Sequence, residues 1–114
     1  MNRLPLLLIA LLLGLSTLSA AAAPEAYRVK DVPNVQLTDR TRFVSDPADA
    51  IRPADEETLN RRIAALRDSF GVQIAIVVIP AYDGSAYNSV RAFANELFNT
   101  WGIGNRETNR GLLI

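Results

Sequence analysis

Residues 93–105 read FANELFNTWGIGN, and this stretch is the strongest indication of the fold. From Val90 onward, apolar side chains recur at the three- and four-residue spacing of one helical face, and most of them lie within this stretch. We therefore expect a helix from about Ala86 to Trp101. Gly102 would end it, because glycine tolerates the left-handed conformation that follows many helices. A short apolar run at residues 111–114 comes next and predicts a buried strand.

The segment before this helix predicts a central strand. Residues 72–79 are β-branched or apolar on both faces except for Gln73. This pattern is typical of a parallel-sheet strand covered on two sides. Pro80 ends the run, and a loop from Ala81 to Asn88 follows.

A further helix is expected to begin at Pro53 and to stop at Gly71. Proline suits the first helical position, where its missing N–H is not needed, and carboxylates follow in the first turn, near the positive end of the helix dipole. One apolar face is predicted, consisting of Leu59, Ile63, Leu66 and Phe70.

These elements predict an α/β fold: a layered βαβ sandwich with a central, largely parallel sheet. We expect the domain to be truncated after its second core strand, residues 111–114. An apolar strand that ended at a free carboxylate would leave edge groups unpaired and place a charge beside the core. We therefore expect the natural chain to continue beyond Ile114.

The N-terminal residues 1–22 are predicted to be a signal peptide. Arg3 supplies a positive charge, Leu4–Leu15 is apolar, and small residues follow up to Ala23. We expect cleavage after Ala21 or Ala22, with an uncleaved N-terminal anchor as the alternative. The protein would then be exported, and be periplasmic or membrane-associated with its domain outside the cytoplasm. Residues 23–41 are polar without a sustained period and predict an extended lead-in.

Composition excludes several kinds of chemistry. The chain has no Cys and no His, so disulfides, thiol catalysis, Cys/His zinc sites and a Ser-His-Asp triad are ruled out within it. The 12 basic residues balance the 12 acidic ones, and loss of Arg3 with the signal peptide would leave a slight negative charge. We therefore expect no nucleic-acid partner, because such binding rests on clustered Lys and Arg.

Several motifs together resemble the TPM domain, a family named for a plant thylakoid-lumen protein, a photosystem II repair protein and an animal acetylcholine-receptor modulator. The resemblance covers about residues 31–114, and residues 42–114 would be the N-terminal part of such a domain. The motifs are VPN at residues 32–34, FVSDP at 43–47, GVQIA at 71–75 and ANELFNTWGIG at 94–104.

The resemblance implies further strands and helices beyond Ile114. Many bacterial members carry a later transmembrane helix, so it also implies membrane association through a missing C-terminal segment. An envelope protein or membrane complex would be the partner. The plant branch has been assigned acid phosphatase activity, and some bacterial members have a calcium-associated acidic pocket.

The family pattern implies an acidic site made by Asp46 and Asp83, near the edge where open α/β sheets bind ligands. These are the candidate catalytic residues, and Asp46, Asp83 and Asn109 are the candidate ligands of calcium or magnesium. The competing interpretation is that both aspartates only stabilise turns. Arg110 departs from the family pattern, in which an Asn precedes the glycine, and would either favour an anion such as phosphate or remain solvated.

Two functions follow from this resemblance. The first is an exported accessory or binding module of the cell envelope, with ion binding at the acidic site described above. The alternative is a weak, metal-dependent, acid phosphatase-like hydrolase that uses Asp46 and Asp83. The GIG corner at residues 102–104 does not indicate a phosphate-binding loop, because it ends a helix, whereas the nucleotide fingerprint begins one.

Overall fold

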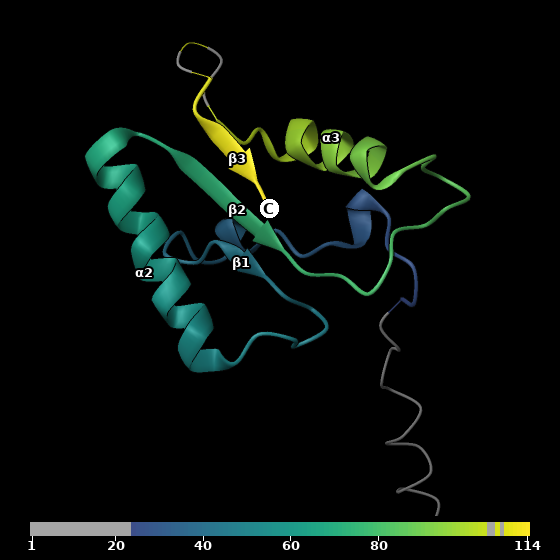
Figure 1. Cartoon of the computed structure of the whole chain (residues 1–114), viewed down its shortest axis with the longest axis horizontal. Helices are drawn as coiled ribbons and strands as arrows, with labels where there is room; N and C mark the ends of the chain where they lie inside the picture. Colours follow the sequence, from purple (N-terminus) through teal and green to yellow (C-terminus); the bar gives the residue numbers. More distant parts are fainter. Residues whose placement is uncertain (1–23, 105–106, 108) are drawn as a thin grey trace, which may run out of the picture.

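A computed structural model describes residues 24–104, 107 and 109–114 of the chain. The predicted signal peptide, residues 1–22, lies outside the described residues. Three parallel strands form one sheet, with a helix on either side of it (Figure 1). The fold is therefore α/β with a parallel sheet, as the sequence predicts.

The sheet has the order β1-β2-β3, so β2 is central, as predicted. The strands are β1 (Val44–Ser45), β2 (Gln73–Val77) and β3 (Gly111–Leu113). Val44 pairs with Ile76 on one side of β2, and Gly111 pairs with Gln73 on the other. Because both pairings are parallel, the carboxyl ends of all three strands lie at one edge of the sheet.

Helix α2 (Pro53–Phe70) has the predicted limits. Pro53 occupies the first turn, and Gly71 ends the helix with φ 68° while its N–H donates to the carbonyl of Arg67. The helix packs against β1 and β2. Its predicted apolar face is only partly covered: Ile63 is 4% exposed, but Phe70 is 62% exposed. The sheet thus covers the middle of this face and leaves the last turn of α2 open.

Helix α3 (Val90–Trp101) begins four residues later than the predicted start at Ala86. Ser89 decides the start, because its hydroxyl oxygen accepts the N–H of Ala92 at 3.1 Å and caps the helix. The residues before it are held in a turn by Asp83, whose carbonyl accepts the N–H groups of Ala86 and Tyr87. The end of the helix is as predicted, with Gly102 at φ 65°.

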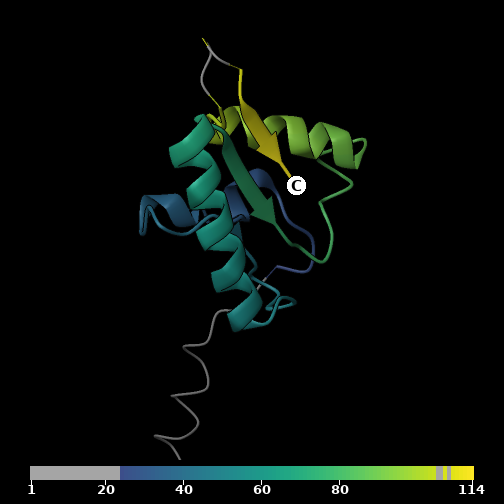
Figure 2. The same ribbon diagram turned by 60° about the vertical axis from the view of Figure 1, so that its left-hand side comes forward.

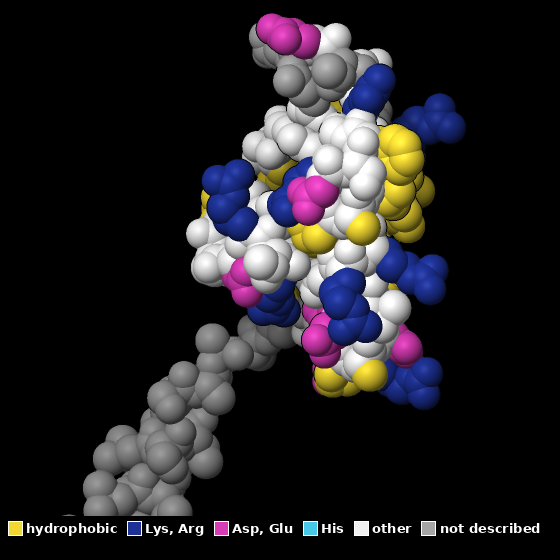
Figure 3. Space-filling model, turned by 90° about the vertical axis from the view of Figure 1, so that its left-hand side faces the viewer, with side chains coloured by type: hydrophobic (Ala, Val, Ile, Leu, Met, Phe, Trp, Pro, Cys, Tyr) yellow, Lys and Arg dark blue, Asp and Glu magenta, His cyan; other side chains and the backbone are white. Residues whose placement is uncertain are grey.

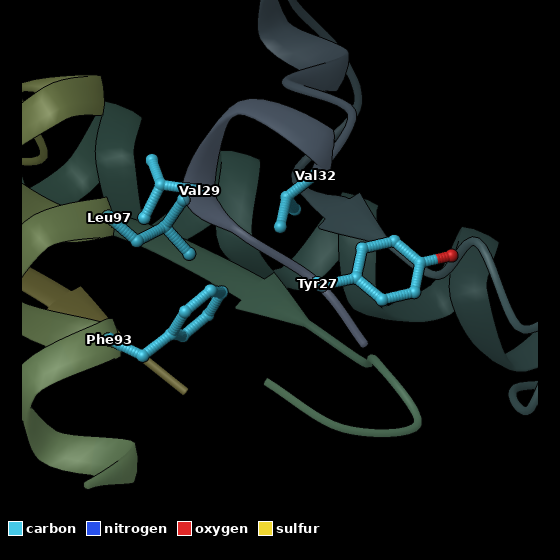
Figure 4. Close-up of a cluster of buried hydrophobic side chains, with 5 residues drawn as sticks. All are labelled: Tyr27, Val29, Val32, Phe93 and Leu97. Carbon is cyan, nitrogen blue, oxygen red and sulfur yellow. The ribbon is translucent and has the colours of Figure 1, made fainter. Parts of the chain in front are cut away.

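The segment predicted as an extended lead-in is part of the core. It forms two short 3₁₀ turns, η1 (Val29–Asp31) and η2 (Val35–Leu37), and passes behind the sheet when α2 is in front (Figure 2). Of the two turns, η1 packs against α3. Side chains of the segment join those of α3 in the main buried cluster, which consists of Tyr27, Val29, Val32, Phe93 and Leu97 (Figure 4). The sequence did not indicate this because the apolar residues of the segment follow neither a helical nor a strand period.

Two backbone hydrogen bonds attach this segment to the loop after β2. Tyr27 donates its N–H to the carbonyl of Ala81 at 2.8 Å, and its own carbonyl accepts the N–H of Asp83 at 2.9 Å. Residue 27 therefore continues the sheet by one bridge with Tyr82. Of the helices in the described ranges, none is both long and apolar enough to cross a bilayer.

Candidate functional site

Asp46 and Asp83 both follow strands at the carboxyl edge of the sheet. Asp46 comes directly after β1, and Asp83 lies in the loop after β2. Open sheets of parallel strands commonly bind ligands at this edge. The fold thus brings both predicted aspartates to the expected side of the sheet.

Asp46 holds together the turn that leads from β1 to α2. Its carboxylate accepts the N–H of Ala50 at 3.0 Å and the N–H of Ile51 at 2.7 Å. Its carbonyl accepts the N–H of Asp49, which has a positive φ of 54°. These contacts give Asp46 the turn-stabilising role typical of aspartate after a strand.

Asp83 has both a local and a distant partner. One carboxylate oxygen accepts the hydroxyl of Ser85 at 2.6 Å and its N–H at 2.9 Å, and the other accepts Nε of Arg28 at 2.9 Å. The hydroxyl of Ser85 and then the guanidinium of Arg28 lower the pKa of Asp83 to about 2. Asp83 is therefore an anion at neutral pH and a poor proton donor, although it keeps the charge that a metal ligand needs.

Arg28 is the residue at this edge that sequence reasoning missed. It is separated from Asp83 by 55 positions in the chain, and the ion pair is half-exposed. Nothing in the local pattern of a polar, aperiodic segment indicates such a contact. A cation that binds Asp83 therefore either displaces the guanidinium of Arg28 or binds against its electrostatic repulsion.

Asn109 and Arg110 lie at the opposite edge of the sheet. Both precede β3, whose first residue, Gly111, is paired with the first residue of β2. The length of the central strand, roughly 17 Å for five residues, separates this edge from the one with Asp46 and Asp83. The fold therefore does not bring Asn109 together with the two aspartates.

Arg110, which was expected either to favour an anion or to be solvated, contacts the end of α2. Its Nη1 donates to the carbonyl of Phe70, the last residue of α2, at 2.8 Å. A positive charge at a helix C-terminus satisfies a free carbonyl and interacts favourably with the helix dipole. Arg110 thus interacts with the C-terminus of α2, at the edge of the sheet opposite to Asp46 and Asp83.

Among the described ranges 24–104, 107 and 109–114, no three acidic, His or Cys side chains cluster closely enough to hold a metal ion. Any ion at the Asp46 and Asp83 edge would therefore need backbone carbonyls or water to complete its shell. Calcium accepts such mixed oxygen ligands.

Charges of both signs are mixed on the face that carries α2 (Figure 3). Exposed ion pairs occur along this helix, including Arg52 with Asp55 at 2.9 Å and Arg61 with Glu57 at 3.3 Å. Such pairs contribute little to stability. They also leave no large surface of one sign on this face.

A shallow depression of about 610 Å³ lies beside Arg28 on the α3 side. Tyr87 and Glu96 line it, and a hydrogen bond to the Glu96 carboxylate raises the pKa of Tyr87. The Tyr87 oxygen also accepts the N–H of Val29 at 3.0 Å. These bonds fasten η1 to α3, so the tyrosine serves the fold.

Comparison with known proteins adds a family and a structural relative. The family model described as the TPM domain matches residues 44–114. The chain is also similar to the solution NMR structure of the N-terminal domain of a protein from P. gingivalis, with 40% sequence identity and a TM-score of 0.64. The similarity covers 79% of this chain and 55% of that one, so the chain spans about half the length of its structural relative. No curated protein matches the chain.

Proposed function

The chain belongs to the TPM domain family, and on this premise we propose that it acts as an exported accessory or binding module of the cell envelope. Calcium or magnesium would bind weakly at the edge formed by Asp46 and Asp83. The partner would be an envelope protein or a membrane complex. The chain spans only about half the length of its structural relative. The role of the whole protein is therefore proposed here together with that of the domain.

One observation carries the choice of a binding module over an enzyme: both candidate catalytic carboxylates already have structural partners. Asp46 is engaged by two backbone N–H groups, and Asp83 by Ser85 and Arg28. A general acid needs a pKa near the working pH, whereas the pKa of Asp83 lies at about 2. Ion binding requires only charge and oxygen atoms, which both residues retain.

Calcium at 10 mM is expected to raise the melting temperature by about 6–11 °C, because an ion at roughly ten times its dissociation constant stabilises the fold by about 1.4 kcal/mol. Arg28→Gln should enlarge the shift, because the variant removes the cation that competes for the Asp83 carboxylate at 2.9 Å. Asp83→Asn should abolish it. Circular dichroism melting curves in calcium and in chelator measure these shifts.

Arg61→Gln is the matched control, because it removes another exposed arginine–carboxylate pair far along α2. It should leave the calcium shift unchanged. No shift in the unaltered protein would disprove the ion site but not the accessory role. Hydrolysis of p-nitrophenyl phosphate that requires the metal and is lost in Asp46→Asn and Asp83→Asn would favour the alternative, a phosphatase-like hydrolase.

Export predicts a defined new N-terminus. The exported protein is expected to begin at Ala22 or Ala23, and Leu8→Arg should block export because it places a charge in the apolar segment of the signal. Intact-mass measurement of the protein recovered from the periplasm or medium tests this. An exported mass that retains residues 1–22 would instead indicate an uncleaved anchor.

A further inference from the structure

A cavity of about 280 Å³ lies at the amino-terminal edge of the sheet, on the side opposite to Asp46 and Asp83. It is enclosed by the first residues of β2, the C-terminal ends of α2 and α3, and the segment from Asn34 to Arg40. The proposed function makes no use of it. Its volume is near the lower limit for small-molecule sites, which suits a ligand of roughly ten non-hydrogen atoms.

Part of the cavity wall is apolar and part is polar. Phe43, Ile74 and Trp101 are among the hydrophobic residues that line it. Phe43 is buried, whereas Ile74 and Trp101 are half-buried and keep part of their apolar surface accessible. An apolar group that entered would bury this surface from water, which is favourable.

Two arginines, Arg40 and Arg67, line the cavity, and a hydrogen bond connects them. The carbonyl of Arg40 accepts Nε2 of Gln36 at 3.2 Å and Nη1 of Arg67 at 3.4 Å, and all three residues line the cavity. The Arg67 guanidinium also lies over the Phe43 ring, 5.3 Å from its centroid. The backbone of Arg40 is therefore fixed beside an apolar wall, with its exposed side chain at the entrance.

Of the two arginines that line the cavity, Arg40 is the one whose charge is not paired within the described part of the chain. Arg110 binds the C-terminal carbonyl of α2, and Arg67 lies 3.2 Å from its neighbour Asp68. The guanidinium of Arg40, by contrast, has no hydrogen-bond or ion-pair partner among the described residues. A positive charge left free at the mouth of a partly apolar cavity favours a ligand that carries a negative charge on an apolar body.

We propose that this cavity binds a short apolar group that ends in a carboxylate, with the apolar part against Trp101 and the carboxylate at Arg40. A small organic acid and the C-terminal residue of an apolar peptide share this chemistry. The proposal is independent of the ion site, which lies at the other edge of the sheet.

Trp101 provides a direct test, because it is the only tryptophan in the chain. Hexanoate, hexan-1-ol and hexylamine have the same tail with a negative, neutral and positive head group. Titration of the purified protein at constant ionic strength should give a saturable change in tryptophan fluorescence with hexanoate, with a dissociation constant on the order of 1 mM. Hexan-1-ol should bind about fivefold more weakly, and hexylamine more weakly still.

Arg40→Gln should weaken hexanoate binding about fivefold and leave hexan-1-ol binding unchanged. Because the side chain is exposed and without a partner in the described part, this variant should fold normally. Arg62→Gln, which removes an exposed arginine of α2 that does not line this cavity, is the control and should bind hexanoate as before. The indole N–H resonance of Trp101 in an NMR titration gives a second readout.

The two sources are separated by acetyl-Gly-Leu with a free carboxyl group and by the same peptide as an amide. Tighter binding of the free acid than of hexanoate would assign the cavity to a peptide C-terminus, and tighter binding of hexanoate would assign it to a small acid. Equal binding of hexanoate and hexan-1-ol, undiminished binding in Arg40→Gln, or no saturable change up to 50 mM hexanoate would overturn the proposal.

Discussion

Phe93→Ala is expected to lower the free energy of unfolding by about 3–5 kcal/mol, the usual cost of removing a large buried aromatic side chain. Phe93 is 4% exposed and packs in the cluster between α3 and the N-terminal segment. It also contacts Tyr87 edge to face, with ring centroids 5.1 Å apart. A small domain has only about 5–15 kcal/mol in total, so this loss would leave it close to unfolding. Urea denaturation followed by circular dichroism measures the change.

Val90→Ala is the matched control in the same helix. The helical pattern places Val90 on the same apolar face, yet it is 66% exposed. Its replacement should therefore change stability by less than about 0.5 kcal/mol. Similar losses in the two variants would mean that α3 does not pack through Phe93 as described.

Tyr27→Ala is expected to cost about 3 kcal/mol or more, although the residue lies in the segment that the sequence predicts as a lead-in. Tyr27 is 2% exposed and belongs to the same cluster as Phe93. Its backbone bonds to Ala81 and Asp83 remain possible in the variant, so the loss reports the side chain. Chemical denaturation gives the free energy, and thermal melting gives an independent check.

Leu37→Ala serves as the control within the same segment, because Leu37 is 83% exposed. Its replacement should have almost no effect on stability. If Tyr27→Ala and Leu37→Ala were both as stable as the unaltered protein, residues 24–41 would be a dispensable lead-in.

The elements best predicted from the sequence are those set by local chemistry. Proline at the first turn and glycine after the last fix the limits of α2, since each acts through its own backbone conformation. The start of α3 was misplaced because Ala86 matches the helical pattern, whereas the hydroxyl of Ser89 caps the helix where it begins. The cap is also a local feature, and its signal was present in the sequence.

The candidate site was predicted less completely. The order of elements indicates that residues after β1 and β2 share an edge, and Asp46 and Asp83 do so. The same topology puts Asn109 at the other end of the strands, because it precedes β3 rather than following it. Whether calcium or magnesium binds at the aspartates stays a prediction.

By itself, the sequence determined the alternation of helix and strand, because period, proline and glycine act over a few residues. The apolar run of β2 predicted the parallel sheet, and the family was indicated by the resemblance of several motifs. Only the tertiary structure decided that Tyr27 is core, that Arg28 meets Asp83, and that Arg40 stands at the mouth of a partly apolar cavity. The reason is physical: these contacts join segments far apart in the chain. Their energies depend on how the layers pack, and no local pattern of residues records that packing.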